Sequence, residues 1–373
     1  MARLAWNGQQ RRKFLKALQA WSQTHGRQLP WRSCGNPYWV WLSEIMLQQT
    51  TVAAVIPYFE RFLTRFPTLS ELASAEVDDV LRLWEGLGYY SRARNLYAAA
   101  RRIVTEFGGE FPREIEQLRQ LPGIGRYTAG AIASFAFDAA APIVEANTQR
   151  LYARLLGEDR EIKGTAAQSA LWEFADFLVS APATGRSPPP QDRFGPGAIN
   201  QALMDLGATV CTPTLPSCTA CPVAQWCSAL ANNCQHTIPR LATRPSITHM
   251  EDATVAIVRS GRFLLRRRPT GERWAGLWDF PRYTIPVGES LATVVTQGVW
   301  QQTGLRIELG QQVAEFKHSV TRYRITLRCL HGTVTAGDLL ADADACWVRS
   351  EELEAYALSV TGRKFARWLQ QQS

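Results

Sequence analysis

LPGIGRYTAGAIASFAFDAAAPIVEANTQR, residues 121–150, is the stretch that decides the fold. It opens with a tight turn that carries Gly123 and Gly125, and an apolar helical run follows to about Phe137. Glycine lets backbone N–H groups approach another group without an intervening Cβ, and a helix N-terminus attracts an anion. The turn therefore indicates an anion site, for which DNA phosphate is the candidate in a basic chain. A glycine-rich turn between two packed helices is the alternative.

The composition is that of a folded, basic protein, with 373 residues, 46% of them hydrophobic and 20% charged. This length allows two domains with ordinary cores. The net charge of +8 and the pI of about 9.2 favour a polyanionic partner without identifying one. No apolar stretch of about 18 residues predicts a membrane span, and the N-terminus lacks the apolar core of a signal peptide. We therefore expect a cytoplasmic protein.

Residues 8–207 have a helical pattern throughout, which predicts helices over 8–25, 165–180 and 198–207. A helix that begins near residue 38 is apolar at most positions, and we expect it to be interrupted around Thr50 and again at Pro57. Glu44, Gln48 and Gln49 are its polar exceptions. A carboxylate in such a helix lowers stability unless it is paired or functional. A Glu44 that simply faces solvent is the alternative.

Two further segments of this region are predicted to be loops. Residues 84–90, WEGLGYY, are followed by Ser91-Arg-Ala-Arg94, so that glycines, tyrosines and arginines lie together. This segment indicates either a loop that touches a base and a phosphate or a turn whose tyrosines pack in the core. Residues 181–197 are polar and rich in Pro and Gly, which predicts an exposed loop or insertion.

The pattern changes after Cys234. We expect a linker over residues 235–251, followed by the apolar runs ATVAIVR, RFLLRRR, ITLRCLHGTV and ACWV, which predict strands. Helices are predicted over 290–303 and 361–371. The sequence thus predicts a helical region over residues 1–234 and an α+β domain over residues 252–373.

Four cysteines form a tight cluster with the spacing C-x6-C-x2-C-x5-C, namely Cys211, Cys218, Cys221 and Cys227. Cys234 lies outside this spacing and is interpreted as a spare thiol. In an intracellular protein such a cluster indicates a metal or iron–sulfur site rather than disulfides. We interpret it as a 4Fe–4S site. Zinc remains an alternative, although its usual pattern has two C-x2-C pairs and only one is present, and so does a chance grouping.

LPGIGRYTAG, the buried SEIMLQQT helix and the cysteine cluster together resemble the helix-hairpin-helix DNA glycosylases with an iron–sulfur cluster. With WEGLGYYSRARNL and the C-terminal α+β domain, the resemblance is to the MutY family of adenine DNA glycosylases over nearly the whole chain. It implies a multidomain fold, in which an all-α helix-hairpin-helix glycosylase with a cluster loop at 211–227 precedes a Nudix-like α+β domain.

The activity that this resemblance implies is base-excision repair of double-stranded DNA. The enzyme would hydrolyse the N-glycosidic bond of adenine mispaired with 8-oxoguanine or guanine, and we expect it to act as a monomer. Two alternatives remain: a glycosylase of the same fold with shifted base specificity, and a non-catalytic iron–sulfur protein that binds DNA.

The resemblance also assigns the catalytic residues. Cleavage through an oxocarbenium-like sugar suits two carboxyl groups, and the target base must first leave the stack. Glu44 matches the acid that protonates adenine N7, and Glu145 stands where the family has an aspartate that stabilises the sugar cation. Tyr127 and Asn147 line the same site. Related endonuclease III enzymes carry a nucleophilic lysine at the position of Tyr127, so we expect a monofunctional glycosylase without lyase activity.

The implied DNA contacts lie in both domains. Arg32 and Leu47 lie near the two extracted bases, and Gln49 and Tyr89 match residues inserted where the bases separate. The remaining implied contacts are Gln48, Thr50, Gly123, Gly125, Thr321 and Arg322.

Two departures from the family pattern concern base removal. The family reads Asp-Gly-Asn where this chain has Glu145-Ala146-Asn147. The extra methylene moves the carboxylate by roughly 1 Å, a displacement that can lower a rate on the order of 100-fold, yet we expect Glu145 to keep the role. Val320-Thr321-Arg322 replaces the usual Phe-Ser-His loop that reads 8-oxoguanine. We expect weaker or altered discrimination of 8-oxoguanine from guanine.

A third departure concerns the Nudix-like domain. Where the Nudix box needs carboxylates for Mg²⁺, this chain reads QGVWQQT over residues 297–303. Hard cations prefer oxygen anions, so we expect a lesion-recognition module that hydrolyses no nucleotide.

Overall fold

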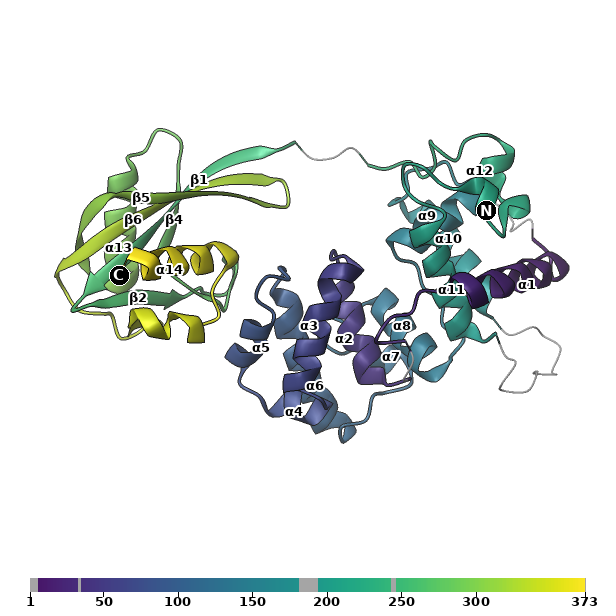
Figure 1. Ribbon diagram of the computed structural model, residues 1–373, viewed down its shortest axis with the longest axis horizontal. Helices are drawn as coiled ribbons and strands as arrows, with labels where there is room; N and C mark the ends of the chain where they lie inside the picture. The colour runs from purple at the N-terminus through teal and green to yellow at the C-terminus, as the bar shows by residue number, and fades with distance from the viewer. Residues whose placement is uncertain (1–5, 33–34, 181–193, 243–245, 373) are drawn as a thin grey trace. The chain divides into compact units, whose positions relative to one another are not determined.

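The computed structural model describes residues 6–32, 35–180, 194–242 and 246–372. The chain divides into two compact units (Figure 1). The helical unit comprises Met1–Ala73 and Ala98–Thr243, and the C-terminal unit comprises Ser74–Tyr97 and Arg244–Ser373. The segment 74–97 therefore groups with the C-terminal unit. Cys34 and most of the loop predicted over 181–197 lie outside the described residues, and Pro196 already begins a helix.

Helices make up the chain up to the cysteine region, which confirms the predicted helices at 8–25, 165–180 and 198–207. They are α1 (Gly8–His25), α2 (Pro37–Leu47), α3 (Val52–Arg65), α4 (Leu69–Ser74), α5 (Val77–Leu83), α6 (Ser91–Phe107), α7 (Ile115–Leu118), α8 (Arg126–Phe137), α9 (Ala146–Leu156), α10 (Thr165–Val179), α11 (Pro196–Thr209) and α12 (Ser228–Ala231). Two short 3-10 turns, η2 (Cys218–Ala220) and η3 (Ala224–Trp226), lie among the cysteines.

The helix α2 begins where the sequence indicates, because the Asn36 side chain accepts a hydrogen bond from the Tyr38 N–H at 2.9 Å and Pro37 occupies the first turn. The expected break after it is confirmed, since α3 starts anew at Val52. The break expected at Pro57 is wrong, because Pro57 lies inside α3. Pro57 and Ala53 are both exposed, so water can satisfy the carbonyl that lacks a partner.

The core of the helical unit explains how α8 and α9 are held. One cluster of buried side chains joins α1, α9, α10 and α11, with Phe14, Leu151, Phe174 and Leu203 among its members. The helix α8 packs against α2 and α11. A Cβ on Gly130 of α8 would lie 2.6 Å from the Pro142 carbonyl oxygen, so this close approach requires glycine.

The C-terminal unit contains a mixed sheet with the strand order β3-β2-β1-β6-β5, while β4 pairs with β1 and β7 pairs with β2. Its strands and helices are β1 (Thr248–Arg259), β2 (Arg262–Arg267), β3 (Trp278–Asp279), β4 (Arg282–Ile285), α13 (Leu291–Thr303), β5 (Arg306–Val320), β6 (Tyr323–Ala336), β7 (Ala345–Val348), η4 (Ser350–Ala355) and α14 (Val360–Gln372). All four predicted strands and both predicted helices are confirmed.

Two features of the sheet differ from the prediction. β1 begins at Thr248, inside the predicted linker, because it pairs in parallel with β6 from Tyr323 onward. β5 was not predicted, because its many polar residues hide the apolar alternation of a strand. Its positions are exposed or only partly buried. β5 and β6 form a long hairpin whose two-residue tip is Thr321-Arg322. Buried clusters lie on the α13 side and on the α14 side of the sheet.

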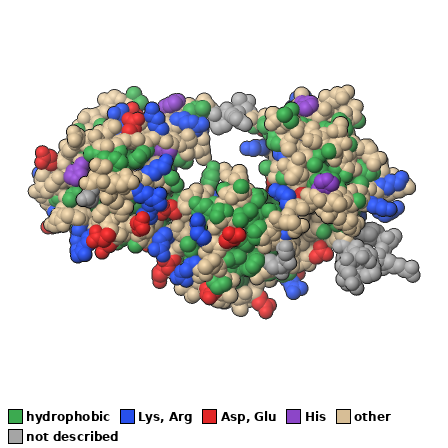
Figure 2. All heavy atoms as spheres, viewed as in Figure 1, with side chains coloured by type: hydrophobic (Ala, Val, Ile, Leu, Met, Phe, Trp, Pro, Cys, Tyr) green, Lys and Arg blue, Asp and Glu red, His purple; other side chains and the backbone are tan. Residues whose placement is uncertain are grey.

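Figure 2 shows Lys and Arg side chains interspersed with Asp and Glu on the visible face of the C-terminal unit. The excess positive charge of the chain is therefore not gathered into a single basic patch on this face. Among the described residues, no helix combines the length and the apolar character needed to cross a membrane.

Candidate active site and cysteine cluster

Glu44 is buried in α2, with 5% of its surface exposed. Its Oε2 accepts a hydrogen bond from the Tyr127 hydroxyl at 2.5 Å. The pKa of Glu44 is raised to about 7, mainly by burial. The charge of Glu145 also raises it, whereas the hydrogen bond from Tyr127 and the charge of Arg32 lower it. The alternative that Glu44 simply faces solvent is wrong. The geometry gives a carboxyl group that is protonated in a large fraction of molecules near neutral pH.

Glu44 lines a small cavity within the helical unit, of about 30 Å³. Of the predicted site residues, Arg32, Leu47 and Glu44 line this cavity together. Its other lining residues are Arg27, Leu29, Trp31, Val40, Ser43, Val52, Phe135, Gln201 and Met204. A space of this size holds about one water molecule and not a purine. A base can therefore enter only if the lining side chains move.

Asp205 of α11 organises the arginines of this cavity. Its carboxylate accepts hydrogen bonds from Arg32 Nη1 at 2.6 Å and Nη2 at 2.9 Å, and from Arg27 Nε at 2.6 Å. Burial alone would raise the pKa of Asp205, but the hydrogen bonds and charge of Arg32, with those of Arg27, lower it overall. Asp205 was not predicted from the sequence. Its signal was the same as that of Glu44, an acid within an apolar helix.

Glu145 caps the N-terminus of α9. Its Oε1 accepts from the backbone N–H groups of Asn147 at 2.9 Å and Thr148 at 2.8 Å, and its Oε2 accepts from Asn147 Nδ2 at 3.2 Å. Burial raises the pKa of Glu145, and these backbone hydrogen bonds oppose the rise. Glu145 and Asn147 do not line the small cavity. Glu145 nevertheless acts on Glu44 and Tyr127, because its charge raises the pKa of both.

The next two turns of α9 fasten the cysteine region. Arg150 donates from Nη2 to Asn147 Oδ1 at 3.0 Å and from Nε to the Cys211 carbonyl at 2.7 Å. Arg154, which is fully buried, donates from Nη1 to Cys211 Sγ at 3.2 Å and to the Thr212 carbonyl at 2.7 Å. The helix that carries Glu145 therefore also holds the first cysteine of the cluster.

The four cysteines of the predicted cluster, Cys211, Cys218, Cys221 and Cys227, line one cavity. Burial, with a smaller contribution from the neighbouring cysteine charges, raises the pKa of Cys221 to about 11. Cys234 is not among the lining residues. Over the described ranges, no three His, Cys, Asp or Glu side chains converge to hold a single metal ion. Four cysteine side chains around one cavity are a donor set that either a 4Fe–4S cluster or a zinc ion can accept.

Three of the predicted DNA contacts have a left-handed backbone. Gln49, Tyr89 and Thr321 have positive φ angles of 58°, 48° and 51°, and they are three of only seven non-glycine residues with such angles in the described part of the chain. All three are exposed. This conformation costs about 1–2 kcal/mol for an L-residue, and such strain concentrates at functional sites. No protein atom lies within 4 Å of a Cβ built on Gly125, so internal packing does not require that glycine.

Comparison with known proteins identifies the chain. The family of HhH-GPD superfamily base excision DNA repair proteins matches residues 42–176, and the NUDIX domain matches residues 253–368. The chain is 35% identical over 413 aligned positions to the adenine DNA glycosylase of Rattus norvegicus, covering 95% of this chain and 77% of that protein. The chain belongs to the adenine DNA glycosylase family.

Other relatives agree with this membership. The adenine DNA glycosylase of Homo sapiens is 34% identical, with 96% of this chain and 74% of that protein covered. The solved structure of a thermostable thymine-DNA glycosylase is 28% identical, with a TM-score of 0.51 over 60% of this chain and 97% of that one. Helix-hairpin-helix glycosylase and Nudix-like folds are therefore joined in one chain, as the sequence indicates.

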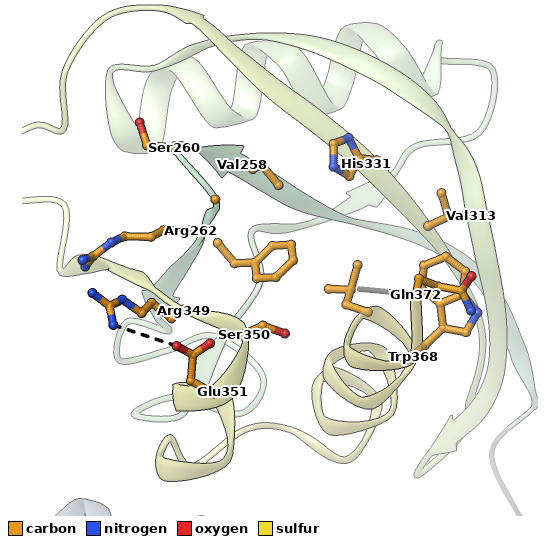
Figure 3. Close-up of a pocket in the computed structure, with 13 residues that line it drawn as sticks. Val258, Ser260, Arg262, Val313, His331, Arg349, Ser350, Glu351, Trp368 and Gln372 are labelled. Carbon is orange, nitrogen blue, oxygen red and sulfur yellow. Dashed lines mark ion pairs between the residues drawn. The ribbon is translucent and has the colours of Figure 1, made fainter.

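The C-terminal unit has two clefts of its own. Gln297, Gln301 and Gln302 of α13 line one of them, so this helix presents amides there. The carboxylates of the same cleft, Glu272 and Glu289, come from outside α13. A second, open cavity of about 710 Å³ is lined by Phe263, His331, Arg349, Trp368 and their neighbours (Figure 3). Figure 3 shows Arg349 turned toward Glu351, with which it forms an ion pair. This cavity contains neither Glu44 nor Glu145 and is not assigned to base removal.

Proposed function

We propose that this protein is a monofunctional adenine DNA glycosylase, which hydrolyses the N-glycosidic bond of adenine opposite 8-oxoguanine or guanine in double-stranded DNA. Family membership supports the reaction class. The observation that carries the proposal is the carboxyl group of Glu44, buried beside a cavity with a pKa raised to about 7. A general acid works best when its pKa lies near the working pH.

The proposed mechanism uses Glu44 as the proton donor. Once the adenine enters the enlarged cavity, the protonated carboxyl of Glu44 donates to N7 and weakens the bond to the sugar. The Tyr127 hydroxyl donates to Glu44 at 2.5 Å and so favours the carboxylate that remains after transfer. Tyr127 is a phenol and offers no amine for a Schiff base, so the reaction ends with hydrolysis.

Glu145 and Asn147 are proposed to stabilise the sugar cation. The carboxylate of Glu145 is fixed by the N-terminus of α9, and Asn147 Nδ2 holds its second oxygen at 3.2 Å. A fixed negative charge stabilises a developing positive charge without reorganising during the reaction. The longer side chain folds back onto its own helix end, which offers a way for glutamate to replace the family aspartate.

Cys211, Cys218, Cys221 and Cys227 are proposed to hold a 4Fe–4S cluster. Their shared cavity and the buried Arg154 next to Cys211 Sγ support this proposal, because a cationic neighbour favours thiolate ligands. Bound there, the cluster would tie the loop 211–227 into the core. Zinc is the alternative, and the two are separated by iron and sulfide analysis and by visible absorbance.

The hairpin tip of the C-terminal unit is proposed to read the base opposite the adenine. Thr321 offers a hydroxyl and Arg322 a guanidinium, which also stacks on Tyr323 at 5.2 Å and donates to its hydroxyl at 3.2 Å. Without the aromatic contact of the usual loop, we propose a reduced preference for 8-oxoguanine over guanine. The same domain is proposed to hydrolyse no nucleotide, because α13 carries amides instead of carboxylates.

The test is single-turnover base release from duplexes with adenine opposite 8-oxoguanine and opposite guanine, followed by alkali to cut abasic sites. We expect release from both duplexes, no strand cleavage before alkali, and loss of release in Glu44→Gln. Tight binding without release by the wild-type protein would refute the enzyme proposal. Strand cleavage without alkali would refute the monofunctional assignment, and release of a base other than adenine would show shifted specificity.

A further inference from the structure

The loop that carries Tyr89 is bonded to the C-terminal domain. Gly86, Gly88 and Tyr89 all have positive φ angles, of 101°, 73° and 48°. The Tyr89 ring is 45% exposed. Glycine adopts such angles freely, but Tyr89 keeps its positive φ only when its surroundings fix the loop. The contacts that fix it come from two sources.

The first source is the loop itself. The Gly88 carbonyl accepts from the Trp84 indole at 3.1 Å and from Arg92 Nη2 at 3.2 Å, and Arg92 also donates to the Leu87 carbonyl at 3.1 Å. These bonds close the loop between the end of α5 and the start of α6. They fix its internal shape but not its orientation.

The second source is the Nudix-like domain within the same unit. Arg363 of α14 forms two hydrogen bonds to Glu85, from Nε at 2.8 Å and from Nη2 at 2.9 Å. Its guanidinium is held in turn by the carbonyls of Leu353 at 2.8 Å and Tyr356 at 2.6 Å. Glu85 directly precedes Gly86, the first residue of the loop with a positive φ angle. The guanidinium of Arg363 is therefore already oriented to donate two hydrogen bonds to one carboxylate.

Asp78 of α5 provides a second such contact. It accepts from Arg267 at 3.1 Å and 2.9 Å and from the Trp278 indole at 3.3 Å, while Arg267 lies 4.7 Å from the Trp278 ring. On the other side of the loop, Arg94 donates to the Ala275 carbonyl. The Nudix-like domain thus holds the segment before, at and after the Tyr89 loop.

We propose that Glu85 and Asp78 are positioning residues, through which the Nudix-like domain holds the Tyr89 loop in the conformation that separates the bases. The inference rests on the proposed function, since it takes Tyr89 as the inserted residue. The side chains of Arg363 and Glu85 are only 10% and 19% exposed. A two-point ion pair shielded to this extent contributes more than a surface pair, whose effect is close to zero.

Charge reversal of this pair gives the test, with the full chain in a Glu44→Gln background so that no base is released. A duplex with 2-aminopurine beside the target adenine reports opening of the stack by its fluorescence. We expect Glu85→Arg and Arg363→Glu each to weaken binding about tenfold and to lower the opening signal. The double variant should recover most of both. Glu106→Arg, which removes an exposed pair with Arg102, is the matched control.

The outcomes separate the inference from the proposed function. The positioning role would be overturned if both single variants open the base stack as fully as the Glu44→Gln parent does. It would also be overturned if the double variant recovers neither DNA binding nor the opening signal. If Glu85→Arg does not fold, Asp78→Arg and its double with Arg267→Asp test the second contact with the same criteria. If the wild-type protein binds and opens the duplex without releasing adenine, the proposed function fails while these comparisons of opening stay interpretable.

Discussion

The hydrogen bond between Tyr127 and Glu44 predicts how the reaction depends on pH. Burial is the largest influence on the pKa of Glu44, and the bond from Tyr127 is the largest that lowers it. Tyr127→Phe removes that bond while keeping the ring. The carboxylate loses more than the neutral acid does, because the hydroxyl donates to the charged form. The pKa of Glu44 should therefore rise above its wild-type value of about 7.

The size of this rise follows from the strength of the bond. A hydrogen bond to a charged group contributes about 1.5–3 kcal/mol, and one pKa unit corresponds to about 1.36 kcal/mol. Water that enters the gap replaces part of the lost bond, so we expect a rise of about one unit. Glu44 acts as an acid in the proposed mechanism. The rate should be highest below its pKa and fall about tenfold per unit above it.

The assay is single-turnover adenine release between about pH 5.5 and 9.5, and the pH at which the rate begins to fall is compared between variants. Tyr127→Phe should move this descending limb to higher pH by about one unit. Tyr152→Phe is the matched control, because the Tyr152 hydroxyl is buried and has no hydrogen-bond partner among the described residues. A limb that moves to lower pH, or that stays in place, would refute the reasoning. A rate that increases with pH through 7 would make Glu44 a base.

Three other variants test the remaining parts of the site. Glu145→Gln should lower the rate of adenine release about 100-fold with little loss of DNA binding. Glu145→Asp keeps the charge and is still a good helix cap, so its rate should stay within about tenfold of wild type. Equal rates for Glu145→Gln and wild type would exclude the cation role. Asp205→Asn should lower the free energy of unfolding by about 3 kcal/mol in chemical denaturation, because it leaves two arginines without their buried partner; an unchanged value would show that water replaces the carboxylate. Thr321→Gly should raise the free energy of unfolding by about 1 kcal/mol, because glycine tolerates the left-handed backbone. It should also reduce the ratio of release rates between 8-oxoguanine and guanine duplexes. A lower free energy of unfolding would show that the Thr321 side chain contributes more than the backbone strain costs.

The sequence predicted the elements whose signals are local. The apolar helix that begins near residue 38, the period of α1 and the apolar alternation of β1 each depend on neighbours in the chain. The prediction failed at Pro57, where the buried Phe59 and Phe62 hold α3 together despite the missing N–H. It also failed at Thr248, whose strand depends on a partner far along the chain. Packing and pairing at long range decided both positions.

The same distinction applies to the candidate site. Glu44 was found because a carboxylate in an apolar helix is conspicuous, and the place of Tyr127 in the same site was implied by resemblance, whereas the hydrogen bond between the two was not predicted. Asp205 was missed although it also lies in a largely apolar helix, because its partners Arg27 and Arg32 are more than 170 residues away in sequence. The bonds of Glu85 to Arg363 are likewise invisible in the sequence, since a surface loop gives no sign of which domain it contacts.

The burial of Glu44 argues against a protein that only binds DNA. Its folded pKa of about 7 lies above the ordinary value of 4.5, so the folded state binds the proton more tightly. The contribution of Glu44 to stability is then greatest at low pH, falls as the pH rises from about 4.5 to 7, and stays lower above that, by about 3 kcal/mol in total. Glu44→Gln should lack this dependence. Chemical denaturation at pH 5 and pH 8 tests this, because the difference in free energy of unfolding between the variant and wild type should change between the two pH values. A carboxyl group that lowers stability at neutral pH has a reason to persist in a protein that uses its proton.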